Sequence, residues 1–128
     1  MNNKIKNFTD LDAWREGHRF VLKIYEIVKK FPRKELFGLS AQLERAAVSI
    51  TSNVAEGFSR YYFKDKVRFY YMSRGSISET QNLLLVAKDL KYIDTNLFNE
   101  NFEQTCKIQS LINGLINSIS KQSSKNHF

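Results

Sequence analysis

Nine residues between positions 42 and 79 have types and spacing that could do chemistry. In each half of this stretch they recur every three or four residues, so they fall along one face of a predicted helix. Arginine, glutamate, serine, asparagine and tyrosine side chains all serve in catalytic and binding sites. We call this set the polar seam, and its members are Gln42, Arg45, Ser49, Asn53, Glu56, Arg68, Tyr71, Gly75 and Glu79.

The two halves of the polar seam match if their helices run antiparallel, and both charged pairs then have opposite sign. Because no histidine or cysteine joins the set, we interpret it as a structural contact that fixes helix register. Removing one charge would leave its buried partner unpaired, at a cost of about 3–5 kcal/mol. A glycine opposite Ser49 would also let the two backbones approach closely. The predicted partners are Arg45 with Glu79, Ser49 with Gly75, Asn53 with Tyr71, and Glu56 with Arg68.

Other residues that could bind metal or catalyse a reaction are few. His18 lies on the apolar face of a predicted helix and has no second ligand three or four residues away, while His127 lies in the polar tail. The Glu-x-x-His motifs of di-iron bundles are missing from the sequence. Cys106, the single cysteine, is predicted to be a small buried hydrophobic residue in a reducing compartment. The sequence therefore predicts no enzyme, no metal site and no cofactor.

Apolar residues recur at helical spacing through four segments, which position the polar seam. We predict helices at about 9–30, 34–59, 63–91 and 95–120, followed by a polar, frayed tail at 121–128. Thr9 is the expected N-cap of the first helix, and that helix should end before Phe31-Pro32. Gly57 is the expected left-handed cap of the second. Short connections between four amphipathic helices predict one all-α domain, an antiparallel up-down-up-down four-helix bundle spanning 1–128.

Composition supports a single domain that needs no membrane. The chain has 128 residues, of which 42% are hydrophobic, and a net charge of +7. No apolar run approaches the roughly 18 residues of a membrane span. Because the first ten residues also lack the apolar region of a signal peptide, we expect a cytoplasmic protein.

The predicted topology gathers basic residues at the two ends of the bundle. A basic surface favours nucleic acid through counterion release, although charge can also serve solubility alone. One end would hold Lys4, Lys6, Arg60, Lys64, Lys66, Arg68, Lys121 and Lys125. The opposite end would hold Lys29, Lys30, Arg33, Lys34, Lys88 and Lys91.

Residues 60–71 interleave basic and aromatic side chains. This mixture suits phosphate contact combined with base stacking. The alternative is that the aromatic residues pack into the core and the charges are solvated. The third predicted helix also carries apolar residues over a wider arc than one packing face needs, which predicts self-association.

Several motifs together resemble one known family, the four-helix bundle proteins encoded in intervening sequences of bacterial large-subunit ribosomal RNA genes. The resemblance covers about residues 8 to 120. Thr51, Val54 and Arg74 depart from the family pattern, which commonly has proline, isoleucine and a small apolar residue there. The motifs are Phe8-x-x-Leu11-x-x-Trp14, Phe31-Pro32-x-x-Glu35-x-x-Gly38-Leu39-x-x-Gln42-Leu43-x-Arg45-Ala46-Ala47-Val48-Ser49-Ile50, Ser52-Asn53-Val54-Ala55-Glu56-Gly57 and Arg74-Gly75-Ser76-x-x-Glu79.

The resemblance implies an antiparallel bundle that assembles as a ring, typically a homopentamer, with no associated enzymatic activity. The accessory protein of diversity-generating retroelements is similar to this family, and it binds a reverse transcriptase and nucleic acid through a basic surface. From charge and resemblance together, we expect a non-enzymatic homo-oligomer that binds RNA or DNA. The alternative is a protein–protein interaction scaffold without nucleic-acid binding. An enzyme built on the polar seam would require an open pocket lined by those residues.

Overall fold

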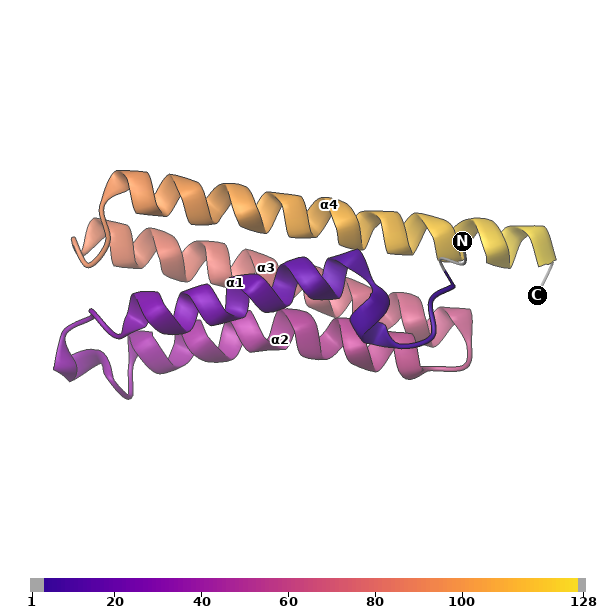
Figure 1. The fold of residues 1–128 in the computed structure, drawn as a ribbon, viewed down its shortest axis with the longest axis horizontal. Coiled ribbons are helices and arrows are strands. Elements are labelled where there is room, and N and C mark those ends of the chain that lie inside the picture. Colours follow the sequence, from indigo (N-terminus) through magenta and orange to yellow (C-terminus); the bar gives the residue numbers. More distant parts are fainter. Residues whose placement is uncertain (1–3, 127–128) are drawn as a thin grey trace.

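The computed structural model describes residues 4–126, with side chains to residue 122, as an all-α four-helix bundle. The long helices are α1 (Asp12–Val28), α2 (Leu39–Ser59), α3 (Phe63–Asp89) and α4 (Thr95–Asn126), with short 3-10 turns η1 (Phe8–Asp10) and η2 (Arg33–Glu35). Consecutive helices run antiparallel and pack together, and α1 also packs against α4, which closes the bundle (Figure 1). The predicted fold class is confirmed.

The bundle has two distinct ends (Figure 1). The α2–α3 connection lies at one end, beside the N-terminal segment and the last turns of α4, and we call this the turn end. The α1–α2 and α3–α4 connections lie at the other, which we call the loop end. At the turn end α4 continues past the other helices. The topology therefore places the chain segments that hold the two predicted basic groups at opposite ends of the bundle.

Helix boundaries differ from the predicted ones for local reasons. Asn7, and not Thr9, caps the first turn: its side-chain oxygen accepts from the Thr9 backbone at 3.1 Å, and Asp10 accepts from the Asn7 backbone at 3.0 Å. The second helix begins at Leu39 instead of 34 because Gly38 is not helical (φ −108°, ψ −113°). The last helix continues to Asn126, past the predicted end near 120, and positions 127–128, with His127, lie outside the described residues.

Gly57 is not a left-handed cap, contrary to prediction. Helix α2 continues through it to Ser59, and among the described residues no glycine has a positive φ. A Cβ atom added at Gly57 would lie 2.7 Å from Cε1 of Tyr70 on α3. The missing side chain thus serves close packing of two helices, which was the role predicted for Gly75. No atom lies within 4 Å of a Cβ placed at Gly75.

The core runs the length of the bundle and receives side chains from every long helix. Because these residues are fully or almost fully buried, they hold the four helices in fixed relative positions. The largest are Phe20 and Ile24 of α1, Leu43 and Ile50 of α2, Tyr70, Ile77 and Leu84 of α3, and Ile108 and Ile112 of α4. The two ends of the bundle are therefore carried on a rigid frame.

Candidate nucleic-acid interface

Small hydroxyl groups, and not charges, join the two halves of the polar seam. The Ser49 and Ser76 hydroxyls lie 2.8 Å apart, so Ser49 meets the residue next to its predicted partner, Gly75. The buried Ser73 hydroxyl donates to the Ile50 carbonyl at 2.7 Å. These two contacts place α2 and α3 within one residue of the predicted antiparallel register.

The predicted charged pairs do not form. Glu56 accepts from Arg60, four residues further along the chain, at 2.8 Å, and the Arg68 guanidinium lies over the Phe69 ring. Within residues 4–126 no ion pair joins Arg45 to Glu79 or Glu56 to Arg68. All four side chains are exposed, so solvation replaces a pairing that would require costly desolvation.

The remaining members of the polar seam form no enclosed site. Asn53 does not contact Tyr71: its amide donates to the Ser49 carbonyl at 2.9 Å and to the Ser49 hydroxyl at 3.1 Å. Gln42, Tyr71 and Gly75 are exposed. The residues predicted to lock the helices therefore form an outward-facing surface.

This placement reverses one expectation about stability. We now expect Arg45→Ala and Glu79→Ala each to change the unfolding free energy of the monomer by less than about 0.5 kcal/mol, because exposed residues without a close partner contribute little. Urea denaturation at a concentration where the chain is monomeric measures this. A loss of several kcal/mol of unfolding free energy in either variant would instead support the predicted ion pair between Arg45 and Glu79.

At the turn end, two arginines are held against one aromatic ring. The guanidinium carbons of Arg60 and Arg68 lie 4.6 and 4.5 Å from the centre of the Phe69 ring. Cation–π contact of this kind restricts long side chains that would otherwise sample many rotamers. The two positive charges are thus already ordered beside the α2–α3 connection.

Two tyrosines project from the same connection. The Tyr61 side chain is 85% exposed and that of Tyr62 is 67% exposed, and their rings lie 5.0 Å apart in an edge-to-face arrangement. Tyr70 of the same segment is buried and Phe63 is half-buried. Packing against the bundle therefore accounts for Phe63 and Tyr70, whereas Tyr61 and Tyr62 remain available to a partner.

Lys66 has a structural role that the sequence did not indicate. Its ammonium group donates to the Phe58 carbonyl at 2.7 Å and lies 5.3 Å from the centre of the Phe58 ring. Burial lowers the pKa of this lysine. It therefore satisfies a carbonyl in the last turn of α2, where a cation also complements the helix dipole.

A matched pair of lysines tests that role. Lys66→Ala is expected to lower the unfolding free energy by about 1 kcal/mol, since it removes a charge-assisted hydrogen bond at a helix end. Lys64→Ala, at an exposed position two residues away, should leave stability unchanged. Chemical denaturation of both variants measures the difference, and equal stability would show that the contact with Phe58 contributes nothing.

The other basic residues predicted for the turn end lie in its peripheral segments. Lys4 and Lys6 precede η1, Lys121 is exposed near the end of α4, and Lys125 belongs to α4 although its side chain is outside the described part. The loop end carries Lys29, Lys30, Arg33, Lys34 and Lys91 on its surface, with Lys88 partly buried.

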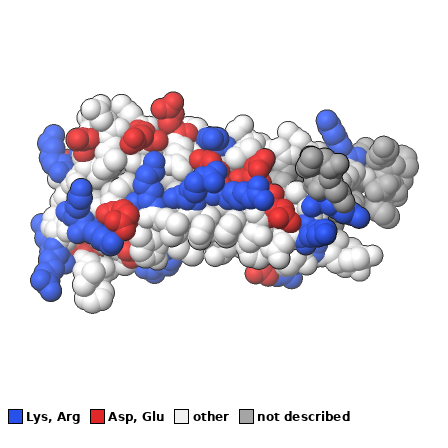
Figure 2. Space-filling view, in the orientation of Figure 1, with Lys and Arg blue, Asp and Glu red and all other residues white. Residues whose placement is uncertain are grey.

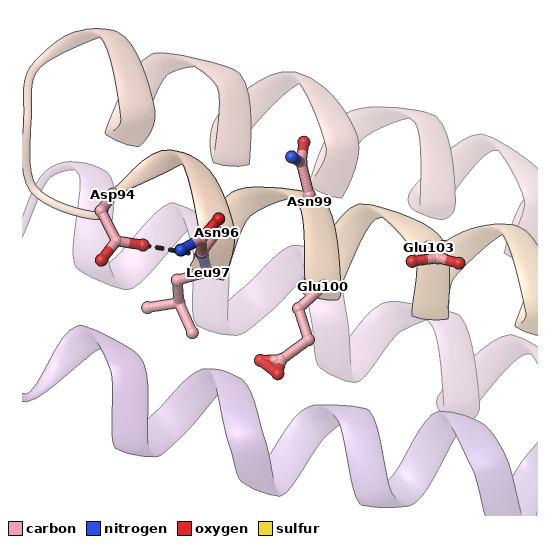
Figure 3. Close-up of a pocket in the computed structure, with 6 residues that line it drawn as sticks. All are labelled: Asp94, Asn96, Leu97, Asn99, Glu100 and Glu103. Atoms are coloured by element: carbon pink, nitrogen blue, oxygen red, sulfur yellow. Dashed lines mark hydrogen bonds between the residues drawn. The ribbon is translucent and has the colours of Figure 1, made fainter.

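The loop end is mixed in charge. Lys29 is paired with Glu26 at 2.8 Å, and Lys88 lies over the Phe98 ring. The first turns of α4 form a hollow whose acidic lining residues are Asp94, Glu100 and Glu103 (Figure 3). Asp94 itself caps α4 by accepting from the Leu97 backbone at 2.7 Å. Carboxylates so placed would repel a phosphate backbone at this end.

One basic surface was missed from the sequence. Figure 2 shows a row of basic side chains along the middle of the face on which α1 lies in front. Arg15, Arg19 and Lys23 follow each other at four-residue steps on α1. The spacing was visible in the sequence, but it does not report the acidic partners. Glu16 accepts from Arg19 at 2.9 Å and lies 3.6 Å from Lys107 of α4, and this contact with Arg19 lowers the Glu16 pKa.

The remaining candidates from the sequence lie outside these surfaces. His18 is exposed and stacks on Trp14, with ring centres 4.6 Å apart. Cys106 is an exposed free thiol, so its predicted burial is wrong. In the part of the chain that the structure describes, no helix combines the length and the apolar character required to cross a membrane.

The sequence of this four-helix bundle matches a known protein family. The sequence model for the family described as 23S rRNA-intervening sequence protein matches residues 9–114. The chain belongs to this family. The matched residues include the polar seam and the α2–α3 connection of this chain, which is thus one of the 23S rRNA-intervening sequence proteins over both surfaces. The family resemblance inferred from the sequence motifs is confirmed.

A solved structure shows the same fold. A protein of unknown function from the S23 ribosomal protein family of Bacteroides thetaiotaomicron superposes with a TM-score of 0.73 over 81% of this chain and 97% of that chain. The two sequences are 19% identical, so the likeness concerns the fold alone. The search of curated proteins found no match.

Proposed function

We propose that this member of the 23S rRNA-intervening sequence protein family is a non-enzymatic, cytoplasmic protein that binds RNA through its turn end. The observation that carries the proposal is the α2–α3 connection, where two exposed tyrosines lie among basic side chains. Between Glu56 and Tyr71, four basic residues face two acidic ones, and one of those acids is already paired with Arg60. The exposed free thiol of Cys106 suits a reducing compartment.

The charge distribution favours the turn end over the other basic surfaces. In the row on α1, Arg15 lies near Asp10 and Arg19 is paired with Glu16, and the loop end shares its surface with the acidic hollow at the start of α4. An anionic polymer gains most where cations outnumber nearby carboxylates. The sequence predicted basic surfaces at both ends of the bundle, and we propose RNA binding at the turn end alone.

Salt-dependent binding of RNA tests the function. Affinity for a labelled RNA should fall steeply as salt rises, and the double variant Lys64→Glu/Lys121→Glu should weaken binding by at least about tenfold. The matched variant Lys30→Glu/Lys34→Glu, at the loop end, should change affinity much less. Absence of binding at low salt, or binding indifferent to ionic strength, would reject the proposal.

We also propose that the protein self-associates, as a ring of the kind its family resemblance implies. Phe37, just before α2, is 92% exposed, and Leu36, Val86 and Leu90 are exposed as well. The Tyr92 hydroxyl donates to Glu35 at 2.8 Å, which brings residues 35–37 beside the end of α3. We call these four exposed residues the apolar patch, and exposed apolar side chains of this size are typical of a protein interface.

Sedimentation analysis of a matched pair tests self-association. Phe37→Asp should shift the protein from an oligomer to a monomer, because it places a charge in the apolar patch. Leu22→Asp, at an exposed leucine on α1, should leave the oligomer intact. A monomeric wild type would end this part of the proposal, and would favour the scaffold alternative if the same patch then captured a defined protein.

A further inference from the structure

The α2–α3 connection suggests what kind of RNA the turn end takes. Resting on the proposed RNA binding, we infer that Tyr61 and Tyr62 form a stacking platform for unpaired nucleotides, with Lys64 and Arg68 contacting the adjoining phosphates. The site thus selects single-stranded segments or loops over continuous duplex.

The geometry of the two tyrosine rings suits stacking on nucleobases. They lie 5.0 Å apart with planes at 90°, so they present two differently oriented aromatic surfaces. Both side chains are mostly exposed, although the adjacent Phe63 and Phe58 are half-buried against the bundle. An exposed aromatic face can accept any nucleobase, since every base has a π surface.

Basic side chains beside the two rings suit contact with phosphates. The Arg68 guanidinium lies over the Phe69 ring, and Lys64 is exposed on the first turn of α3. Arg60 lies over the same ring but is paired with Glu56, so it is not counted among the phosphate contacts. Lys66 is held by the Phe58 carbonyl and is not counted among the phosphate contacts. Cations next to exposed rings combine the backbone contact and the base contact that single strands require.

Paired bases within a continuous duplex cannot make the same contacts. In A-form RNA each base face is covered by its stacked neighbours, and the deep, narrow major groove does not admit side chains to the base edges. A duplex could meet the cations of the turn end but could not cover the two tyrosine rings. The tyrosines should therefore matter only for unpaired nucleotides.

The experiment compares two probes with three proteins at one salt concentration. The probes are labelled single-stranded oligouridine and a blunt RNA duplex of equal length. The double variant Tyr61→Ala/Tyr62→Ala should bind oligouridine at least about tenfold more weakly than wild type, because each stacked base contributes substantially, while its duplex affinity is unchanged. Tyr61→Phe/Tyr62→Phe, which keeps both rings, should restore single-strand binding.

The slope of affinity against salt separates stacking from charge. Loss of the tyrosine rings should leave the slope of wild type, whereas Lys64→Ala should reduce it by about one, as the loss of one phosphate contact requires. Equal affinity for both probes, or an equal loss of both in the tyrosine variant, would overturn the inference and leave RNA binding standing. A wild type that binds neither probe would instead reject the proposed function itself.

Discussion

Gly57→Ala is expected to lower the unfolding free energy by about 2 kcal/mol, although alanine is the better helix former. The new Cβ would lie 2.7 Å from Cε1 of Tyr70, 3.0 Å from Cδ1 of the same ring and 3.1 Å from Cβ of Phe69. Tyr70 is 2% exposed and cannot swing into solvent, so α2 and α3 must separate. Urea denaturation monitored by circular dichroism measures the loss.

Gly75→Ala is the matched control for that substitution. It lies within α3, its added Cβ meets nothing within 4 Å, and the residue is exposed. Helix propensity alone should then raise the unfolding free energy by up to about 1 kcal/mol. If Gly57→Ala lowers the unfolding free energy and Gly75→Ala raises it, only Gly57 lies at the close contact between the helices. A neutral Gly57→Ala would show that the helices readily adjust.

Alkaline pH should destabilise the fold through Tyr70. Burial raises the pKa of this tyrosine from 10.0 to about 12, so between these values the unfolded chain has lost the phenolic proton and the folded chain retains it. The contribution to stability is complete below pH 10 and is lost as pH rises toward 12. The expected loss is about 2–3 kcal/mol for a shift of this size.

Comparison with Tyr70→Phe isolates this contribution. The hydroxyl of Tyr92 also has a raised pKa, because it donates to the Glu35 carboxylate. This effect remains in the variant. The unfolding free energy of wild type should therefore fall more steeply between pH 10 and 12 than that of Tyr70→Phe. Parallel curves would show that the phenol ionises as readily in the folded state as in the unfolded one.

The sequence was sufficient for the helices because their apolar periodicity is strong and their connections are short. It also predicted the α2–α3 register to within one residue, although the charged pairs used for that prediction do not form. The observed contacts join Ser49 to Ser76 and Ser73 to the Ile50 carbonyl. The start of α2 was harder to predict. The non-helical backbone of Gly38 moves the first residue of the helix to Leu39, and no pattern of apolar residues indicates this.

The charged residues were harder to place, for a physical reason. Spacing fixes the face on which Arg45 or Glu56 lies, but long side chains on that face can turn to solvent or to a neighbour in their own helix. Glu56 pairs with Arg60, four residues along the chain. This pairing loses less side-chain entropy than a pairing with a residue on the neighbouring helix. The same freedom hid the acidic neighbours of the α1 row and the attachment of Lys66 to Phe58.

The projection of α4 beyond its neighbours has a consequence for hydrogen exchange. Ser120, Lys121 and Gln122 are exposed, and this stretch of helix has only its own backbone bonds to protect it in an isolated chain. Its amide protons should exchange within a short labelling time, while those of the enclosed turns around Ile108 and Ile112 persist. Slowed exchange confined to the last turns, on adding RNA or on raising protein concentration, would identify α4 as the segment that a bound molecule covers.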